Sequence, residues 1–188
     1  MIETLIRENS TSDDVALFKV NKVLQSTYPS NHAYGLTYHF AMVPYCKPKS
    51  VLMLGYGLGT IPGLIRKVWG EDVKVTNVDI MPDPQKYVEF SYVQGEADKA
   101  LREFNKGLFK KKFDFILIDL FNGGDSDPCV FDKGFAKRIY QLANKGCYIN
   151  TTRAEGKGLK VYEDAGFVCE NERIVILGNN LISLWSKK

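Results

Sequence analysis

The stretch Val51–Thr60, with the sequence VLMLGYGLGT, joins a continuous apolar run to a G-x-G-x-G turn. The apolar run is typical of a strand buried on both faces. Ile61, Leu64, Ile65 and Val68 follow at helical spacing and predict an amphipathic helix. A glycine turn lets the backbone approach a ligand closely, and the helix after it directs unpaired N–H groups toward the same space. The sequence therefore predicts a ligand-binding turn between a buried strand and a helix.

The alternation of strand and helix returns along the chain. Further apolar runs occur at residues 73–80, 91–93, 113–120 and 146–151. Apolar residues at helical spacing occur at 97–104 and 131–143, and more weakly at 158–165. Strands that alternate with helices form a parallel sheet with crossover helices on both faces. We therefore predict an α/β, Rossmann-like, doubly wound fold with a mostly parallel sheet.

The end of the chain departs from this alternation. Residues 167–177 and 181–185 are strand-like runs joined by the turn Gly178-Asn179-Asn180. So short a connection joins antiparallel strands only. We expect a hairpin whose last strand runs antiparallel to its neighbour at one edge of the sheet.

The first fifty residues differ again. Residues 15–20 and 23–27 flank an Asn21-Lys22 turn and predict a small hairpin, followed by a short helix at 35–43. We expect residues 1–50 to form a hairpin-and-helix extension. Residues 51–188 then form the Rossmann-like domain, as a single compact unit.

Composition excludes several classes of protein. The 188 residues are 45% hydrophobic and 25% charged, as in an ordinary globular domain. A net charge of +3, spread along the chain, does not indicate nucleic-acid binding. No run is long enough to span a membrane and no secretory signal is present, so we expect a cytoplasmic protein. The four cysteines lie far apart and offer no metal-ligand spacing, so we expect free thiols and no metal.

Acidic residues follow three of the other predicted strands. Asp79 lies 79 − 59 = 20 residues after Gly59 and is placed to accept hydrogen bonds from ribose hydroxyls. Glu96 opens the helix at 97–104, where it is placed either beside a purine amine or simply at a helix start. Asp119 ends the strand at 113–120. Thr60 stands where a dinucleotide fingerprint has its third glycine, so a nucleoside site is favoured over a pyrophosphate site.

These motifs together resemble a known family. Residues 51–60, 74–80, 95–101 and 113–122 are similar to the class I S-adenosylmethionine-dependent methyltransferase fold. The flanks resemble its spermidine synthase-like branch more narrowly. The matching flanks are the hairpin at 18–27, the pair Tyr38-His39, and the helix and strand at 131–148 followed by Asn150.

The resemblance implies a cosubstrate, S-adenosylmethionine or its decarboxylated form, and a role for each matching residue. It implies that Gly55, Gly57 and Gly59 cradle the methionine end, with Tyr56 in the same loop. It also implies that Asp79 holds the ribose beside Ile80, and that Glu96 and Ala97 border the adenine. Gln25 covers the nucleoside from the hairpin. Asp119 stands at the position of the catalytic acid, and His39 faces the acceptor.

The chain departs from aminopropyltransferases at two places. Leu58 replaces the acid that grips the aminopropyl ammonium, and Leu120-Phe121-Asn122 replaces the stretch that carries the diamine-binding acid. Asp125 and Asp127 follow later in a longer loop and substitute only if that loop folds back. We therefore expect an S-adenosylmethionine-dependent methyltransferase of spermidine synthase-like type, acting on a small molecule.

Two alternatives stay open. One is aminopropyl transfer from decarboxylated S-adenosylmethionine, and the other is a non-catalytic module for nucleoside binding or dimerisation. Asp119 and His39 are the candidate general bases, although each residue type also serves structural roles. Tyr28, Tyr34, Tyr38 and Phe40 are candidates for a homodimer surface or for core packing. The acceptor pocket is expected at residues 26–40, 121–131 and 152–160.

Overall fold

The structure is a computed structural model. It describes residues 38–57, 59–81, 91–106, 111–172 and 179–188 in full. For residues 5–10, 13–20, 23–28 and 173–175 it describes the backbone.

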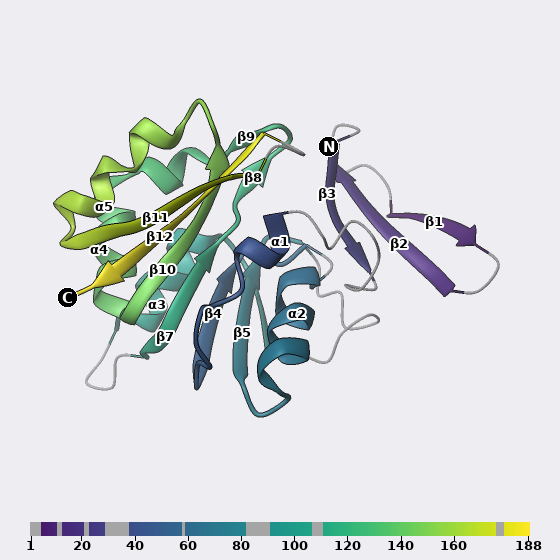
Figure 1. Cartoon of the computed structure of the whole chain (residues 1–188), viewed down its shortest axis with the longest axis horizontal. Helices are drawn as coiled ribbons and strands as arrows, with labels where there is room; N and C mark the ends of the chain where they lie inside the picture. The colour runs from purple at the N-terminus through teal and green to yellow at the C-terminus, as the bar shows by residue number, and fades with distance from the viewer. Residues whose placement is uncertain are drawn as a thin grey trace.

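A seven-stranded sheet forms the centre of the molecule, with the strand order β11-β12-β10-β7-β4-β5-β6 (Figure 1). β6, β5, β4, β7 and β10 pair in parallel. The strands are β4 (Ser50–Leu54), β5 (Lys74–Asp79), β6 (Ser91–Gln94), β7 (Phe113–Ile118), β10 (Ala143–Thr152), β11 (Phe167–Val175) and β12 (Asn180–Lys187). The mostly parallel α/β fold predicted from the sequence is confirmed.

The last strand lies in a different place from the one we expected. β12 is antiparallel, as predicted, but it lies between β10 and β11 and pairs with both. β11 therefore forms the edge of the sheet. Burial explains the order, because β12 carries Leu181, Ile182 and Trp185 in the core, whereas β11 has the exposed polar residues Asn171 and Glu172.

Helices cover both faces of the sheet (Figure 1). One face carries α1 (Tyr38–Ala41) and α2 (Thr60–Trp69), and the other carries α3 (Ala97–Phe104), α4 (Lys133–Leu142) and α5 (Lys160–Asp164). The short 3-10 helices η2 (Pro128–Phe131) and η3 (Gly156–Leu159) precede α4 and α5. The predicted helices at 61–68, 97–104, 131–143 and 158–165 match these within a few residues. The helix expected at 35–43 is observed as α1, and residues 35–37 lie outside the described part of the chain.

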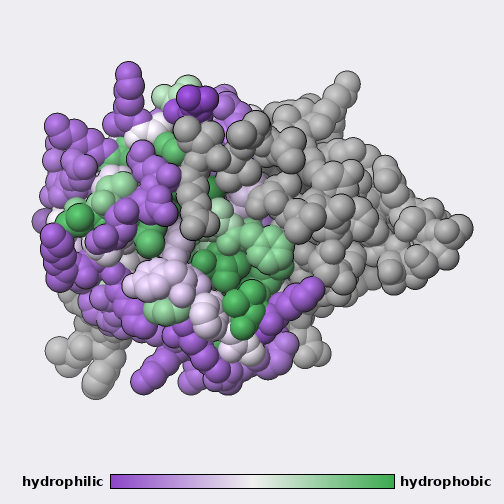
Figure 2. All heavy atoms as spheres, in the orientation of Figure 1, coloured by the Kyte–Doolittle hydropathy of each residue, from purple (hydrophilic) through white to green (hydrophobic). Residues whose placement is uncertain are grey.

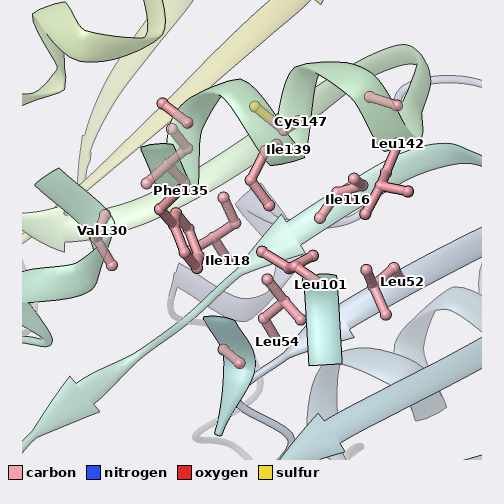
Figure 3. Close-up of a cluster of buried hydrophobic side chains, with 14 of the residues drawn as sticks. Leu52, Leu54, Leu101, Ile116, Ile118, Val130, Phe135, Ile139, Leu142 and Cys147 are labelled. Atoms are coloured by element: carbon pink, nitrogen blue, oxygen red, sulfur yellow. The ribbon is translucent and has the colours of Figure 1, made fainter. Parts of the chain in front are cut away.

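Alternate residues of each central strand pack on opposite faces, as a pleated strand requires. Leu52 and Leu54 of β4 join the cluster beneath α3, α4 and α5, which Figure 3 shows with Ile116 and Ile118 of β7. Val51 and Met53 pack on the other face with residues of α2. Two apolar layers therefore hold β4 and β7, and they fix the carboxyl ends of these strands.

A separate three-stranded antiparallel sheet precedes this domain, with β1 (Leu5–Ser10), β2 (Asp13–Val20) and β3 (Val23–Tyr28). β2 and β3 confirm the predicted hairpin, since Val20 pairs with Val23 across its turn. β1 was not expected from the sequence. The division of the chain at residue 50 stays a prediction.

The described surface in Figure 2 is mostly hydrophilic, and hydrophobic residues gather near the centre of the view. Phe40, one of the four candidates for a dimer surface, is 43% exposed. Tyr38 is partly buried and binds Asp119, whereas the side chain of Tyr28 and all of Tyr34 lie outside the described residues. The homodimer stays a prediction. None of the helices in the described part of the chain has the length and apolar character needed to cross a membrane.

Candidate functional site

The loops after β4 and β7 meet at the carboxyl edge of the sheet. The Asp119 amide donates to the Leu54 carbonyl at 2.9 Å. At Gly55, where φ is +87°, an added Cβ would lie 2.0 Å from the backbone oxygen of Asp119. Glycine is therefore the residue that lets the two loops touch, and this contact places Asp119 beside the glycine turn.

The glycine loop is also tied to β5 through Asp79. Its Oδ2 accepts hydrogen bonds from the amides of Tyr56 at 2.7 Å and Gly57 at 3.0 Å. Its Oδ1 accepts one from the Met81 amide at 3.0 Å. Gly57 and Gly59 have positive φ angles, which give the loop its tight curvature. The carboxylate thus holds the loop in place and keeps room for one more hydrogen bond at Oδ1.

An apolar side chain and an acidic one flank Asp79. Ile80, which follows it, is 64% exposed, an unusual degree for isoleucine. The Gly95 amide donates to the Asp79 carbonyl at 2.8 Å, which brings the start of α3 alongside. Glu96 is the N-cap residue of α3, but its exposed side chain makes no capping hydrogen bond. Its carboxylate is therefore open toward solvent, while Ala97 is buried.

Asp119 is the centre of a polar network. Its Oδ2 accepts from the Tyr38 hydroxyl at 3.2 Å and its Oδ1 from Asn150 Nδ2 at 2.8 Å. Asn150 Oδ1 in turn accepts from Asn180 Nδ2 at 2.9 Å. Three segments far apart in the sequence therefore meet at one carboxylate, and a fourth is linked to it through Asn150.

Burial is the main cause of the shifted acidity at this site. It raises the pKa of Asp119 to about 6, and the Asp79 carboxylate adds to the rise. The hydrogen bonds from Asn150 and Tyr38 act in the opposite direction. Burial, and then the charge of Asp119, raises the pKa of Tyr38 well above its usual value. At neutral pH the pair is therefore a carboxylate beside a neutral phenol.

His39 lies next to this network. Its side chain is buried, and its ring lies against that of Tyr38 with centroids 4.1 Å apart. Among the described residues, no group of three or more His, Cys, Asp or Glu side chains is arranged to hold a metal.

A small hairpin lies within the segment 121–131, where the sequence predicts part of the acceptor pocket. β8 (Phe121–Asn122) pairs with β9 (Asp125–Ser126), and Asp127 N donates to Leu120 O at 2.8 Å, so the loop folds back as a compact unit. Glu155 fastens it to the end of β10, because its carboxylate accepts hydrogen bonds from Ser126 and Thr152. Partial burial acts to raise the pKa of Glu155, but these hydrogen bonds outweigh it. The pKa of Glu155 is therefore lowered, and the group stays ionised.

The structure brings most of the predicted site residues together at one edge of the sheet. Gly55, Gly57, Asp79 and Asp119 are linked by the contacts given above, and Ile80 and Glu96 border them. Gln25 lies in β3, but its side chain is outside the described residues, as is Leu58.

Sequence reasoning missed the roles of Tyr38, Asn150 and Asn180 around Asp119. Asn150 directly follows the apolar run 147–149, and a polar residue in that position is the signal that could have found one of them. The sequence around Asn180 predicts a turn and gives no comparable signal.

Comparison with known proteins shows the fold. No protein-family model matches the sequence, and no curated protein matches it. Among solved structures, Aeropyrum pernix fibrillarin with natively bound S-adenosyl-L-methionine has a TM-score of 0.61 at 10% identity, over 95% of this chain and 84% of that one. Magnesium protoporphyrin IX methyltransferase from Synechocystis PCC 6803, with bound cosubstrate, has a TM-score of 0.55 at 13% identity, over 73% and 69%.

An O-methyltransferase from Bacillus cereus, in complex with S-adenosylhomocysteine, has a TM-score of 0.54 at 13% identity over 74% of each chain. At these identities the likeness concerns the fold. The chain has the Rossmann-like fold found in class I S-adenosylmethionine-dependent methyltransferases.

Proposed function

We propose that this protein is an S-adenosylmethionine-dependent methyltransferase of spermidine synthase-like type, with a small-molecule acceptor. The observation that carries the proposal is the junction of the glycine loop, Asp79 and Asp119 at the carboxyl edge of this fold. Ligands of doubly wound folds bind at that edge. Fibrillarin and the Synechocystis methyltransferase, which share the fold, hold S-adenosylmethionine.

The residues at the junction fit the parts of this cosubstrate. Gly57 and Gly59, at positive φ angles, carry no Cβ atoms that would obstruct the methionine end. Exposed Ile80 offers an apolar surface to an adenine ring, and the open carboxylate of Glu96 accepts from an amine. In the loop as it stands, Asp79 offers one free acceptor position to the ribose, because two backbone amides occupy Oδ2. Engaging both oxygens requires these amides to move.

Methyl transfer requires alignment and a place for the acceptor's proton. When bound, S-adenosylmethionine supplies a methyl group activated by a sulfonium. Asp119, with a pKa of about 6, is ionised at neutral pH and accepts a proton from a nucleophilic hydroxyl or amine. The Tyr38 hydroxyl holds one of its oxygens, and His39 packs behind Tyr38. The β8–β9 hairpin, fastened by Glu155, screens the acceptor from water on one side.

A specific observation bears on aminopropyl transfer. Asp127, one of the two later acids considered as a replacement for the missing diamine-binding residue, accepts a hydrogen bond from the Cys129 amide and caps η2. A carboxylate used in this way is less available to a diamine ammonium. The proposal therefore favours methyl transfer, and the decarboxylated cosubstrate is a separate arm of the test.

The first test is thermal unfolding with S-adenosylmethionine, its decarboxylated form and methylthioadenosine, each titrated in parallel. A ligand at about 100 times its Kd stabilises the native state by about 2.7 kcal/mol, which raises Tm by several degrees. A rise with S-adenosylmethionine is the expected result. A rise with the decarboxylated form alone would establish aminopropyl transfer as the better reading, and no rise with any ligand would reject the nucleoside site.

The second test removes Asp79. The Asp79→Ala variant is expected to bind S-adenosylmethionine about tenfold more weakly or worse, because it loses the ribose acceptor and the anchor of the glycine loop. Asp72→Ala is the matched control, since Asp72 is an exposed acid in the turn before β5. Isothermal titration of both variants measures the difference, and unchanged affinity in Asp79→Ala would refute the assignment.

A further inference from the structure

Two asparagines stand behind Asp119 on neighbouring strands. Asn150 lies near the end of β10 and Asn180 begins β12, where it pairs with Thr152. Asn150 is fully buried and Asn180 is 9% exposed. Burying two amides in a sheet is costly unless each is hydrogen-bonded. Their place in the sheet therefore calls for an explanation beyond packing.

The donors and acceptors of each group fix the direction of the hydrogen bonds that run from Asn180 through Asn150 to Asp119. An ionised Asp119 only accepts, so Asn150 must turn its Nδ2 toward it. The Asn150 carbonyl oxygen then faces β12, where Asn180 Nδ2 donates to it. If Asn150 turned over, its carbonyl oxygen would face the carboxylate and its amide would face the Asn180 donor. Both hydrogen bonds would be lost, so Asn180, with its Nδ2 facing Asn150, favours the orientation of Asn150 that donates to Asp119.

We propose that Asn180 is a positioning residue, which locks the Asn150 amide so that it donates to Asp119 and keeps that carboxyl group ionised and correctly oriented. Only the use of Asp119 as a base rests on the proposed function. The lock itself is a property of the folded chain. Neither asparagine acts on the reacting atoms directly, since both act through Asp119.

The groups that face Asp119 show why the orientation of the Asn150 amide affects the ionisation of this acid. Tyr38 of α1 donates to Oδ2, and the Asp79 carboxylate at the end of β5 repels the negative charge. Burial also favours the protonated acid, and the hydrogen bonds from Asn150 and Tyr38 oppose it. Without the Asn150 donor, the Tyr38 hydrogen bond would still favour the ionised form, whereas burial and the Asp79 charge would favour the protonated form. The acid would then be about half protonated at neutral pH, instead of mostly ionised.

The experiment measures the pKa of Asp119 by carboxyl-carbon NMR titration of the full chain, with no cosubstrate present. Asn150→Ala removes the donor, and Asn180→Ala removes the group that orients it. Each substitution is expected to raise the pKa of Asp119 by about one pH unit, the size of one lost charge-assisted hydrogen bond. Asn171→Ala, at an exposed asparagine of β11, is the matched control and should leave it unchanged.

The double variant tests whether Asn180 acts through Asn150. If it does, adding Asn180→Ala to Asn150→Ala raises the pKa no further, because there is no amide left to orient. Equal shifts in the two backgrounds, or no shift in Asn180→Ala, would overturn the proposal. If the alanine variant does not fold, Asn180→Leu replaces it, since leucine has the same branched shape, although it is larger, and carries no donor.

Activity separates this inference from the proposed function. In an active enzyme, the acidic limb of the kcat pH profile should move upward by the same amount in Asn180→Ala, while KM for S-adenosylmethionine stays unchanged. A raised pKa of Asp119 with an unmoved kcat profile would keep the lock and refute the role of Asp119 as base. An inactive protein with the expected NMR shifts would refute the proposed function and leave the lock in place.

Discussion

At the scale of single residues, Asp119 shows how much of a site can be predicted from the sequence. An acid directly after a buried apolar run predicts a carboxylate at the edge of a parallel sheet, and the structure places it there. The partners of Asp119 are a different matter. Asn150 lies 31 positions away and Tyr38 lies 81 positions away, so only the fold brings them together. The identity of a candidate base was therefore predictable, but its acidity was not.

The raised pKa of Asp119 makes a prediction about stability. The native state holds this proton up to about pH 6, whereas the pKa of an unperturbed aspartic acid is 3.8. The contribution to stability is therefore full below the lower pKa and is lost as the pH rises through the higher one. Asp119→Asn keeps the shape and removes the titration. Its free energy of unfolding, relative to wild type, should rise by about 2 to 3 kcal/mol between about pH 4 and about pH 8.

Urea unfolding of both proteins at the two pH values measures this difference. The wild-type protein supplies the reference at each pH, so the effect of pH on the rest of the chain cancels. A difference that does not depend on pH would show that Asp119 titrates normally.

At the scale of elements, apolar runs and helical spacing located the strands and helices of the main sheet within a few residues. The short strands β8 and β9 were not predicted, because two residues each are too few to show a hydrophobic periodicity. The order of β11 and β12 in the sheet was not predicted either. A hairpin specifies that two strands are neighbours, but which of them enters the sheet depends on packing against β10.

The pairing of β10 with β12 depends on Gly146. A Cβ at this position would lie 2.2 Å from the backbone oxygen of Trp185, and backbone cannot yield as a flexible side chain does. Gly146→Ala should therefore destabilise the protein by about 2 kcal/mol or more through strain between the strands. Gly124→Ala is the matched control, because its Cβ would meet open space in the β8–β9 turn. Thermal unfolding compares them, and equal Tm values would contradict the packing described here.

At the scale of the whole molecule, stability is concentrated in the middle of the sheet. β4 and β7 have a partner strand on each side and an apolar cluster on each face. β6 is an edge strand with no fully buried residue. The candidate site draws on both a central strand and an edge strand, since Asp119 follows β7 whereas Glu96 follows β6.

Hydrogen exchange should reveal this gradient. Amides of β4 and β7 are expected to exchange slowest, by way of global unfolding, and those of β6 by faster local opening. Exchange measured by mass spectrometry on peptides covering these strands provides the comparison. Protection of β6 equal to that of β4 would show that the sheet opens only as one unit.

The place of β12 also bears on how the chain folds as it leaves the ribosome. Residues are added from the amino terminus, so β11 is made before the strand that lies between it and β10. Until residues 180–187 emerge, β11 lacks its partner and β10 keeps one edge unpaired. Unpaired strands are open to pairing with other chains. The nascent chain is therefore most vulnerable to aggregation just before its last strand inserts, when the strands that carry the glycine loop and Asp119 have already been made.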